Sequence, residues 1–143
     1  MSVGYRGKHV HSLVLQRETR KLIASPEIQA YLRRPYRVAY HPIPLTGGSS
    51  VNGRTYYLDP NIPAKLDQFV LWHERVEKAL RDVYRMTYDR AHQIATTAER
   101  ALVESRGLNW EEYKREIGKV VRHDETEPMR NLPKDLDMGP YRK

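Results

Sequence analysis

The sequence predicts an α+β fold, in which a small antiparallel sheet packs against two long helices, with a third helix and an irregular tail. Residues 37–58 contain two short runs of β-prone residues separated by glycine, serine and asparagine, which is typical of strands joined by a turn. From about residue 64 to residue 106, apolar residues recur at steps of three and four, the helical period. A length of 143 residues favours one domain, because domains usually have about 100–150 residues.

The N-terminal part of the chain is expected to contain an arm and a short helix. Residues 1–17 show no sustained period and contain two glycines, so we expect a basic arm. Residues 18–34 are expected to include a helix, with Ser25 as an N-cap and Pro26 at the first helical position of its second half.

The expected sheet consists of residues 36–43 and 55–58. The first run ends at Pro42, and the pair Asn52-Gly53 between the two runs suits a tight turn with positive φ. We therefore expect the two runs to pair as antiparallel strands.

The two long helices are expected at about residues 64–86 and 88–106. Thr87 suits the N-cap of the second helix, and Gly107 suits its stop. Because almost no loop separates them, the helices should fold back on each other or cross at a steep angle.

A third helix and a tail complete the chain. Asn109 with Glu112 resembles a capping box, and the helix is expected to end near Arg122. The remaining residues contain three prolines and mixed charge, so their order depends on docking. The expected organisation is a basic arm (1–17), a single α+β domain (18–122) and an irregular C-terminal tail (123–143).

Composition excludes several classes of protein. The chain has no cysteine, so disulfide scaffolds, cysteine zinc sites and thiol nucleophiles are excluded, and any metal must be held by His, Asp and Glu. No apolar stretch approaches the roughly 18 residues of a membrane span, and no secretory signal is visible. We therefore expect no membrane association and a cytoplasmic location.

The net charge of +7 is unevenly distributed. Residues 1–50 hold eight Lys and Arg against two acids, or +6, whereas residues 51–143 hold seventeen against sixteen, or +1. Binding of an acidic partner or a nucleic acid is therefore expected, if anywhere, through residues 1–50.

The most informative motif is His73-Glu74-Arg75-Val76-Glu77 in the first long helix. Residues four apart lie on one face of a helix, so His73 and Glu77 can reach one metal ion. The spacing is that of the HExxH zinc helix, with glutamate in place of the second histidine. Carboxylate oxygen binds zinc at nearly the distance of imidazole nitrogen, so the replacement is chemically allowed.

The second long helix supplies the expected third ligand. His92 is preferred, and Glu99, about 10 Å further along the axis, is an alternative ligand or a supporting group. Two imidazoles and one carboxylate leave the fourth position of a zinc ion to water, and Glu74 would then be the catalytic general base. The sequence therefore predicts a site for Zn²⁺ or another divalent metal.

A structural role for the same residues is the alternative. Glu74 with Lys78 and Glu77 with Arg81 have the i, i+4 spacing of ion pairs on exposed helices. A histidine on an apolar stripe is also commonly a hydrogen-bonded core residue. The alanine-rich face of the second helix favours the metal site, because unpaired polar groups would be costly where helices approach closely. Both interpretations stay open.

The order of a strand at residues 54–58, a helix with His73-Glu74-x-x-Glu77 and a following helix with a further ligand resembles zincin-type metallopeptidases over residues 37–106. The family's second motif histidine is Glu77 here. The resemblance implies a zinc-dependent hydrolase of peptide or amide bonds. Residues 55–58 would form an edge strand beside the metal and pair with an extended peptide or protein substrate by strand addition.

A wider pattern, YLDPNIP, HERVEKAL, YDRAHQIATTAER and LPKDLDMGPY, resembles small uncharacterised proteins of bacteria and prophages over residues 56–141. This resemblance implies no established activity. It adds a virion-associated location to the cytoplasmic one if the chain is phage-derived.

A non-enzymatic module is the alternative function. In it, the polar cluster is a buried network, and the basic arm binds an acidic partner or a nucleic acid in a larger assembly. The sequence contains neither a glycine-rich phosphate loop nor a GxSxG elbow, so it supports neither P-loop nucleotide hydrolysis nor serine-esterase chemistry.

Overall fold

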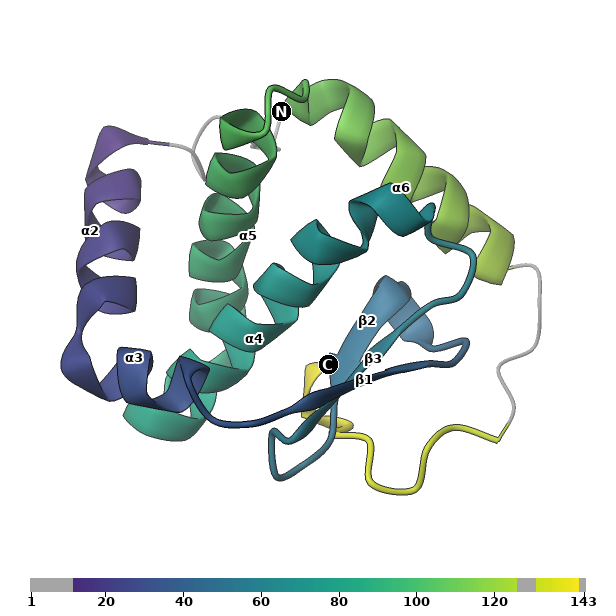
Figure 1. Ribbon diagram of the computed structural model, residues 1–143, viewed down its shortest axis with the longest axis horizontal. Helices are drawn as coiled ribbons and strands as arrows, with labels where there is room; N and C mark the ends of the chain where they lie inside the picture. The colour runs from purple at the N-terminus through teal and green to yellow at the C-terminus, as the bar shows by residue number, and fades with distance from the viewer. Residues whose placement is uncertain (1–11, 126–130, 142–143) are drawn as a thin grey trace.

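The computed structural model describes residues 12–125 and 131–141, and within these ranges it confirms the α+β fold class. Figure 1 shows the helices on one side and around the top of a small sheet. The elements are α2 (Leu13–Ala24), α3 (Pro26–Leu32), β1 (Arg37–Tyr40), β2 (Gly47–Ser49), β3 (Thr55–Leu58), α4 (Asp67–Tyr84), α5 (Tyr88–Ser105) and α6 (Trp110–Glu125). Short 3₁₀ turns occupy Pro44–Thr46, Ala64–Leu66 and Gly139–Tyr141.

The helices α4 and α5 form the central packed pair. Arg85, in the left-handed conformation, ends α4, and the side chain of Thr87 caps α5 as expected. With only three residues between them, the helices run antiparallel and side by side (Figure 1). Small residues at the contact, such as Ala79 and Ala95, are fully buried and let the backbones approach closely. No helix in the described ranges is both long and apolar enough to cross a membrane.

The sheet is mixed, so the expected purely antiparallel sheet is wrong. The strand order is β1-β3-β2, with β1 parallel and β2 antiparallel to β3. The glycine-rich residues of β2 looked like part of a long turn, because glycine is depleted in strands. They instead pair with β3, and the turn is shorter: Gly53 has a φ of 71° at its end. The strand β3 is therefore central and cannot accept an added substrate strand.

The helix α2 begins earlier than expected. Ser12 caps α2, so the expected arm is wrong for residues 12–17, whereas residues 1–11 lie outside the described part of the chain. Ser25 ends α2, and its side chain caps α3 with Pro26 in the first turn, as predicted. The helix α2 packs on α5 and α3 packs on α4, with Leu15, Ile28 and other buried apolar residues in one core cluster.

Two further segments, α6 and residues 131–141, follow α5. The Asn109 side chain accepts a hydrogen bond from the Glu112 amide (2.9 Å), confirming the cap, and α6 extends to Glu125. Residues 131–141 then follow the outer edge of β2, where Ser50 and Leu136 form an antiparallel bridge. Figure 1 shows this segment passing beneath the sheet and ending beside it.

Candidate metal centre

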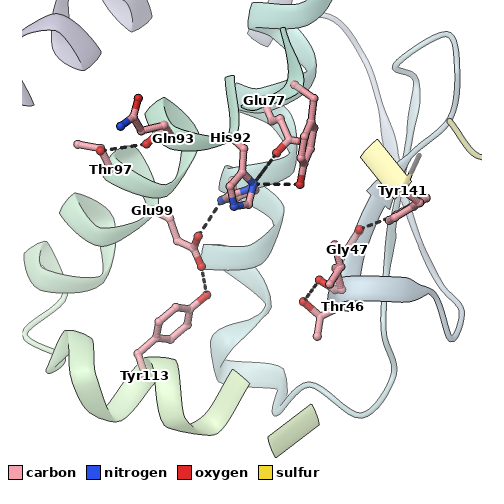
Figure 2. A network of polar contacts seen from close by, with 12 residues as sticks. Thr46, Gly47, Glu77, His92, Gln93, Thr97, Glu99, Tyr113 and Tyr141 are labelled. Carbon is pink, nitrogen blue, oxygen red and sulfur yellow. Dashed lines mark hydrogen bonds and ion pairs between the residues drawn. The ribbon is translucent and has the colours of Figure 1, made fainter. Parts of the chain in front are cut away.

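The antiparallel helices α4 and α5 bring His73, Glu77 and His92 together. The Nε2 atom of His73 lies 3.1 Å from Oε2 of Glu77 and 3.2 Å from Nδ1 of His92. The third side of the triangle, from His92 Nδ1 to Glu77 Oε2, measures 3.0 Å. These three side chains form a group that can hold a metal ion. Figure 2 shows Glu77 and His92 pointing toward each other from neighbouring helices.

The triangle has the dimensions of a metal site. Donors about 2.0–2.1 Å from a tetrahedral zinc ion lie about 3.3 Å from one another, close to the three separations here. Hydrogen bonds alone satisfy the three side chains less well than a metal ion would. If both rings donate to Glu77, the two facing nitrogens of His73 and His92 are both donors and meet at 3.2 Å without an acceptor between them. A cation that takes one lone pair from each residue satisfies all three.

The ionisable groups of the cluster shift one another's pKa values. Burial would lower the pKa of His73, but the charge of Glu99 and hydrogen bonds to Glu77 and Glu99 outweigh it and raise that pKa well above the ordinary value. Burial would likewise raise the pKa of Glu77, yet hydrogen bonds from His73 and His92 lower it to about 2. In the metal-free protein His73 therefore holds its proton to higher pH than a free histidine does, between the carboxylates of Glu77 and Glu99, where positive charge is favoured.

Glu99 supports the cluster from behind. Its Oε1 atom lies 2.8 Å from Nδ1 of His73, the ring nitrogen that faces away from the triangle. The other carboxylate oxygen accepts a hydrogen bond from the hydroxyl of Tyr113 on α6 (Figure 2). This is the arrangement in which an outer carboxylate orients a ligating histidine. Glu99 thus lies behind His73 and outside the triangle.

Glu74 lines the same cavity as the triangle. The cavity has a volume of about 420 Å³ and is bordered by residues of α4, α5, α6 and β2. Burial, and next the charge of Glu77, raise the pKa of Glu74 to about 8, although His73 opposes this shift. Gly47 of β2 leaves room for this side chain, since a Cβ atom there would lie 2.9 Å from Oε2 of Glu74. A carboxyl group that holds a proton near neutral pH in a cavity is suited to proton transfer.

Glu74 and Glu77 do not form the ion pairs with Lys78 and Arg81 that a purely structural role would give them. Lys78 instead contacts Asp82 (3.2 Å) and Asp137 (2.9 Å), and Arg81 contacts Asp137 (3.1 Å). Both carboxylates thus remain directed to the cavity and the triangle.

Sequence reasoning missed three tyrosines of this cavity. The Tyr88 hydroxyl lies 3.3 Å from Nδ1 of His92, one helical turn away, so its i, i+4 spacing was a usable signal. Tyr113 and Tyr141 come from α6 and from the docked segment, and no local pattern places them here. The hydroxyl of Tyr141 donates to the carbonyl of Gly47 (3.0 Å).

The cavity rim carries backbone strain. Leu45 and Thr46 have φ values of 60° and 71°, a left-handed conformation that is costly for bulky and β-branched residues. Figure 2 shows Thr46 beside Gly47, at the end of β2 that faces the cluster. Such strain persists only where surrounding contacts hold it, and it is frequent at functional sites.

Comparisons of the chain with protein-family models, with curated proteins and with solved structures found no match. The assignment of chemistry to this cavity therefore depends on its geometry.

Proposed function

We propose that the protein is a zinc-dependent hydrolase of peptide or amide bonds. The observation that carries the proposal is the triangle of His73, Glu77 and His92 with Glu74 in the same cavity. Two imidazoles and one carboxylate are a donor set used by catalytic zinc, and three protein ligands leave one position open. Other divalent metals bind the same donors, so the test must also establish which metal supports activity.

Each side chain has a separate role in this proposal. A bound zinc ion supplies Lewis-acid activation of water and of the substrate carbonyl. Glu74 acts in its ionised form, which a bound cation nearby favours. It takes a proton from the attacking water and delivers it to the leaving amine. A carbon–oxygen bond forms as the carbon–nitrogen bond breaks, and the products are a carboxylic acid and an amine. Glu99 and Tyr113 hold His73 in position throughout.

The test is hydrolysis of a mixture of internally quenched fluorescent peptides by untagged, zinc-loaded protein. We expect cleavage that a chelator abolishes and that added zinc restores. Glu74→Gln should retain zinc and lose about 10²–10⁴-fold of the rate, the usual contribution of a general base. Glu104→Gln is the matched control, because Glu104 is exposed and pairs with Arg100 away from the cavity. Absence of cleavage by zinc-loaded protein, or full activity of Glu74→Gln, would contradict the proposal.

The second candidate is a module that binds an acidic partner or a nucleic acid through residues 1–50. It is favoured by the excess charge of +6 in that region and by Arg17, Arg20 and Lys21, all exposed on α2. Binding of a labelled single-stranded oligonucleotide at 50 and 200 mM salt tests it. Phosphate contacts predict a steep loss of affinity with salt and after charge reversal of the three residues. Absence of binding at low salt would rule out nucleic acid.

A further inference from the structure

Residues 131–141 are bound to the rest of the protein in the manner of an extended peptide ligand. The Val51 amide donates to the Asp135 carbonyl, and the Asp137 amide donates to the Ser49 carbonyl, both at 2.8 Å. These bonds flank the antiparallel bridge between Ser50 and Leu136. Strand addition of this kind is a general way for a sheet edge to bind a peptide. The edge in use is β2, since β3 is central.

Side chains of the segment fill specific positions beside this edge. Leu136 is buried against Ile43 and Tyr57. The Tyr57 hydroxyl also donates to the carboxylate of Asp135 (2.6 Å). Gly48 provides the space, because a Cβ atom there would lie 2.9 Å from the Leu136 side chain.

Of the positions along the segment, that of Asp137 most strongly requires one kind of side chain, a carboxylate. Lys78 is only 4% exposed, and its ammonium group lies 2.9 Å from Oδ2 of Asp137. Arg81 contacts the same oxygen at 3.1 Å. Lys78 also pairs with Asp82 (3.2 Å), but Asp137 is the carboxylate that contacts both cations. A chain that replaces residues 131–141 should therefore bind best when it brings a carboxylate to this position.

The segment leads directly into the metal cavity. Pro140 and Tyr141 form part of its wall, together with Glu74 and Glu77. The Tyr141 hydroxyl is held by the Gly47 carbonyl, at the end of β2 beside Glu74. Figure 2 shows Tyr141 and Gly47 together, on the side of the cavity opposite the helix that carries Glu99.

We propose that the outer edge of β2, with Lys78 and Arg81, is the substrate-binding groove, and that residues 131–141 occupy it as a built-in competitor. The substrate class is an extended peptide with an apolar residue followed by an acidic one. The apolar side chain would bind where Leu136 packs, and the acidic side chain would contact Lys78 and Arg81 as Asp137 does. That a peptide bound in this groove is cleaved rests on the proposed hydrolase function. That the groove binds such a peptide does not.

The experiment measures peptide binding to the full chain without metal. The probe is a fluorescein-labelled peptide, NLPKDLDMGPY, identical to residues 131–141. Asp137→Ala in the chain removes the anchor of the chain's own segment, while Lys78 keeps its contact with Asp82. We expect this variant to bind the probe at least tenfold more tightly than the unsubstituted chain, whose own segment competes at high effective concentration.

A matched pair of peptides tests the acidic requirement. Asparagine in place of the aspartate equivalent to Asp137 should weaken binding to the Asp137→Ala chain at least tenfold. Asparagine at the position of Asp135 removes one contact, from Tyr57, and should have a smaller effect. Failure of the folded variant to bind the probe, or equal binding of both asparagine peptides, would overturn the proposal. Because no metal is present, these outcomes are separate from success or failure of the hydrolase proposal.

Hydrogen exchange of the unsubstituted chain gives a second measurement that needs no variant. If the segment leaves and returns, the amides of Val51 and Asp137 should exchange at least tenfold faster than the amide of Val76 in the core of α4. Exchange of all three at the rate of global unfolding would show that the segment is a fixed part of the fold, and would overturn the proposal.

Discussion

The Nδ1 atom of His73 lies 2.8 Å from a carboxylate oxygen of Glu99, so the ring has a fixed orientation before any metal binds. With Nδ1 donating to Glu99, the opposite nitrogen points at Glu77 and His92. Glu99 is itself held by the hydroxyl of Tyr113, whose pKa burial and the charge of Glu99 raise, which keeps the hydroxyl proton in place. A chain of contacts from α6 through α5 to α4 thus positions one donor of the triangle.

Weakening this chain should lower metal affinity without removing the site. Glu99→Gln is expected to reduce zinc affinity about 10–100-fold, the usual effect of losing an outer carboxylate partner. Tyr113→Phe keeps the ring packing on Phe69 and Trp110 and should have a smaller effect in the same direction. Competition with a chromophoric chelator measures both. Tyr84→Phe is the control, because its hydroxyl contacts Ser25 away from the cavity, and an equal loss in this variant would contradict the account.

Removing the charge of Glu74 should stabilise the metal-free protein. Its folded pKa of about 8 exceeds the ordinary 4.5, so its contribution to stability is complete below pH 4.5 and is lost as pH rises through 8. Glutamine cannot ionise, so Glu74→Gln should raise the free energy of unfolding at pH 8 by about 4 kcal/mol, the cost of ionising a carboxyl whose pKa lies near 8 instead of 4.5. Urea denaturation at pH 8 and pH 4.5 measures this. A gain of the same size at both pH values would show that ionisation is not the cause.

Local sequence patterns were sufficient to predict the helices. The apolar period of α4 and α5, the cap at Thr87 and the cap at Asn109 each depend on residues within a few positions of one another. The spacing of His73 and Glu77 is local in the same way, and the short connection between the helices then places His92 opposite them.

Long-range contacts explain what the sequence did not predict. Gly47 and Gly48 pair with β3 at positions where Glu74 and Tyr141 leave little room for a side chain, so contacts that no local pattern contains explain glycine in this strand. The parallel pairing of β1 with β3 and the docking of Leu136 likewise join residues far apart in the chain. The support of His73 by Tyr113 depends on the angle of α6, which the period of that helix does not specify.

The pH dependence of stability should differ between the metal-free and the zinc-loaded protein. The raised pKa of His73 gives a contribution that is complete below about pH 6.5 and is lost as pH rises through the folded value. Zinc binding instead requires neutral imidazoles and so strengthens as pH rises. We expect melting temperatures with chelator to fall between pH 5.5 and 8, while the increase caused by zinc grows. Superimposed curves with chelator and with zinc would contradict a metal site.

The most direct test of the metal centre is the zinc content of untagged protein after incubation with zinc and buffer exchange. We predict one zinc ion per chain, and loss of at least about 100-fold in affinity for His92→Ala, more than an outer partner costs. The side chain of His92 is 47% exposed, so this variant should stay folded, and His41→Ala, at a histidine that contacts the Pro42 carbonyl, should bind normally. Absence of stoichiometric zinc in the unsubstituted protein, or an unchanged affinity in His92→Ala, would contradict the account.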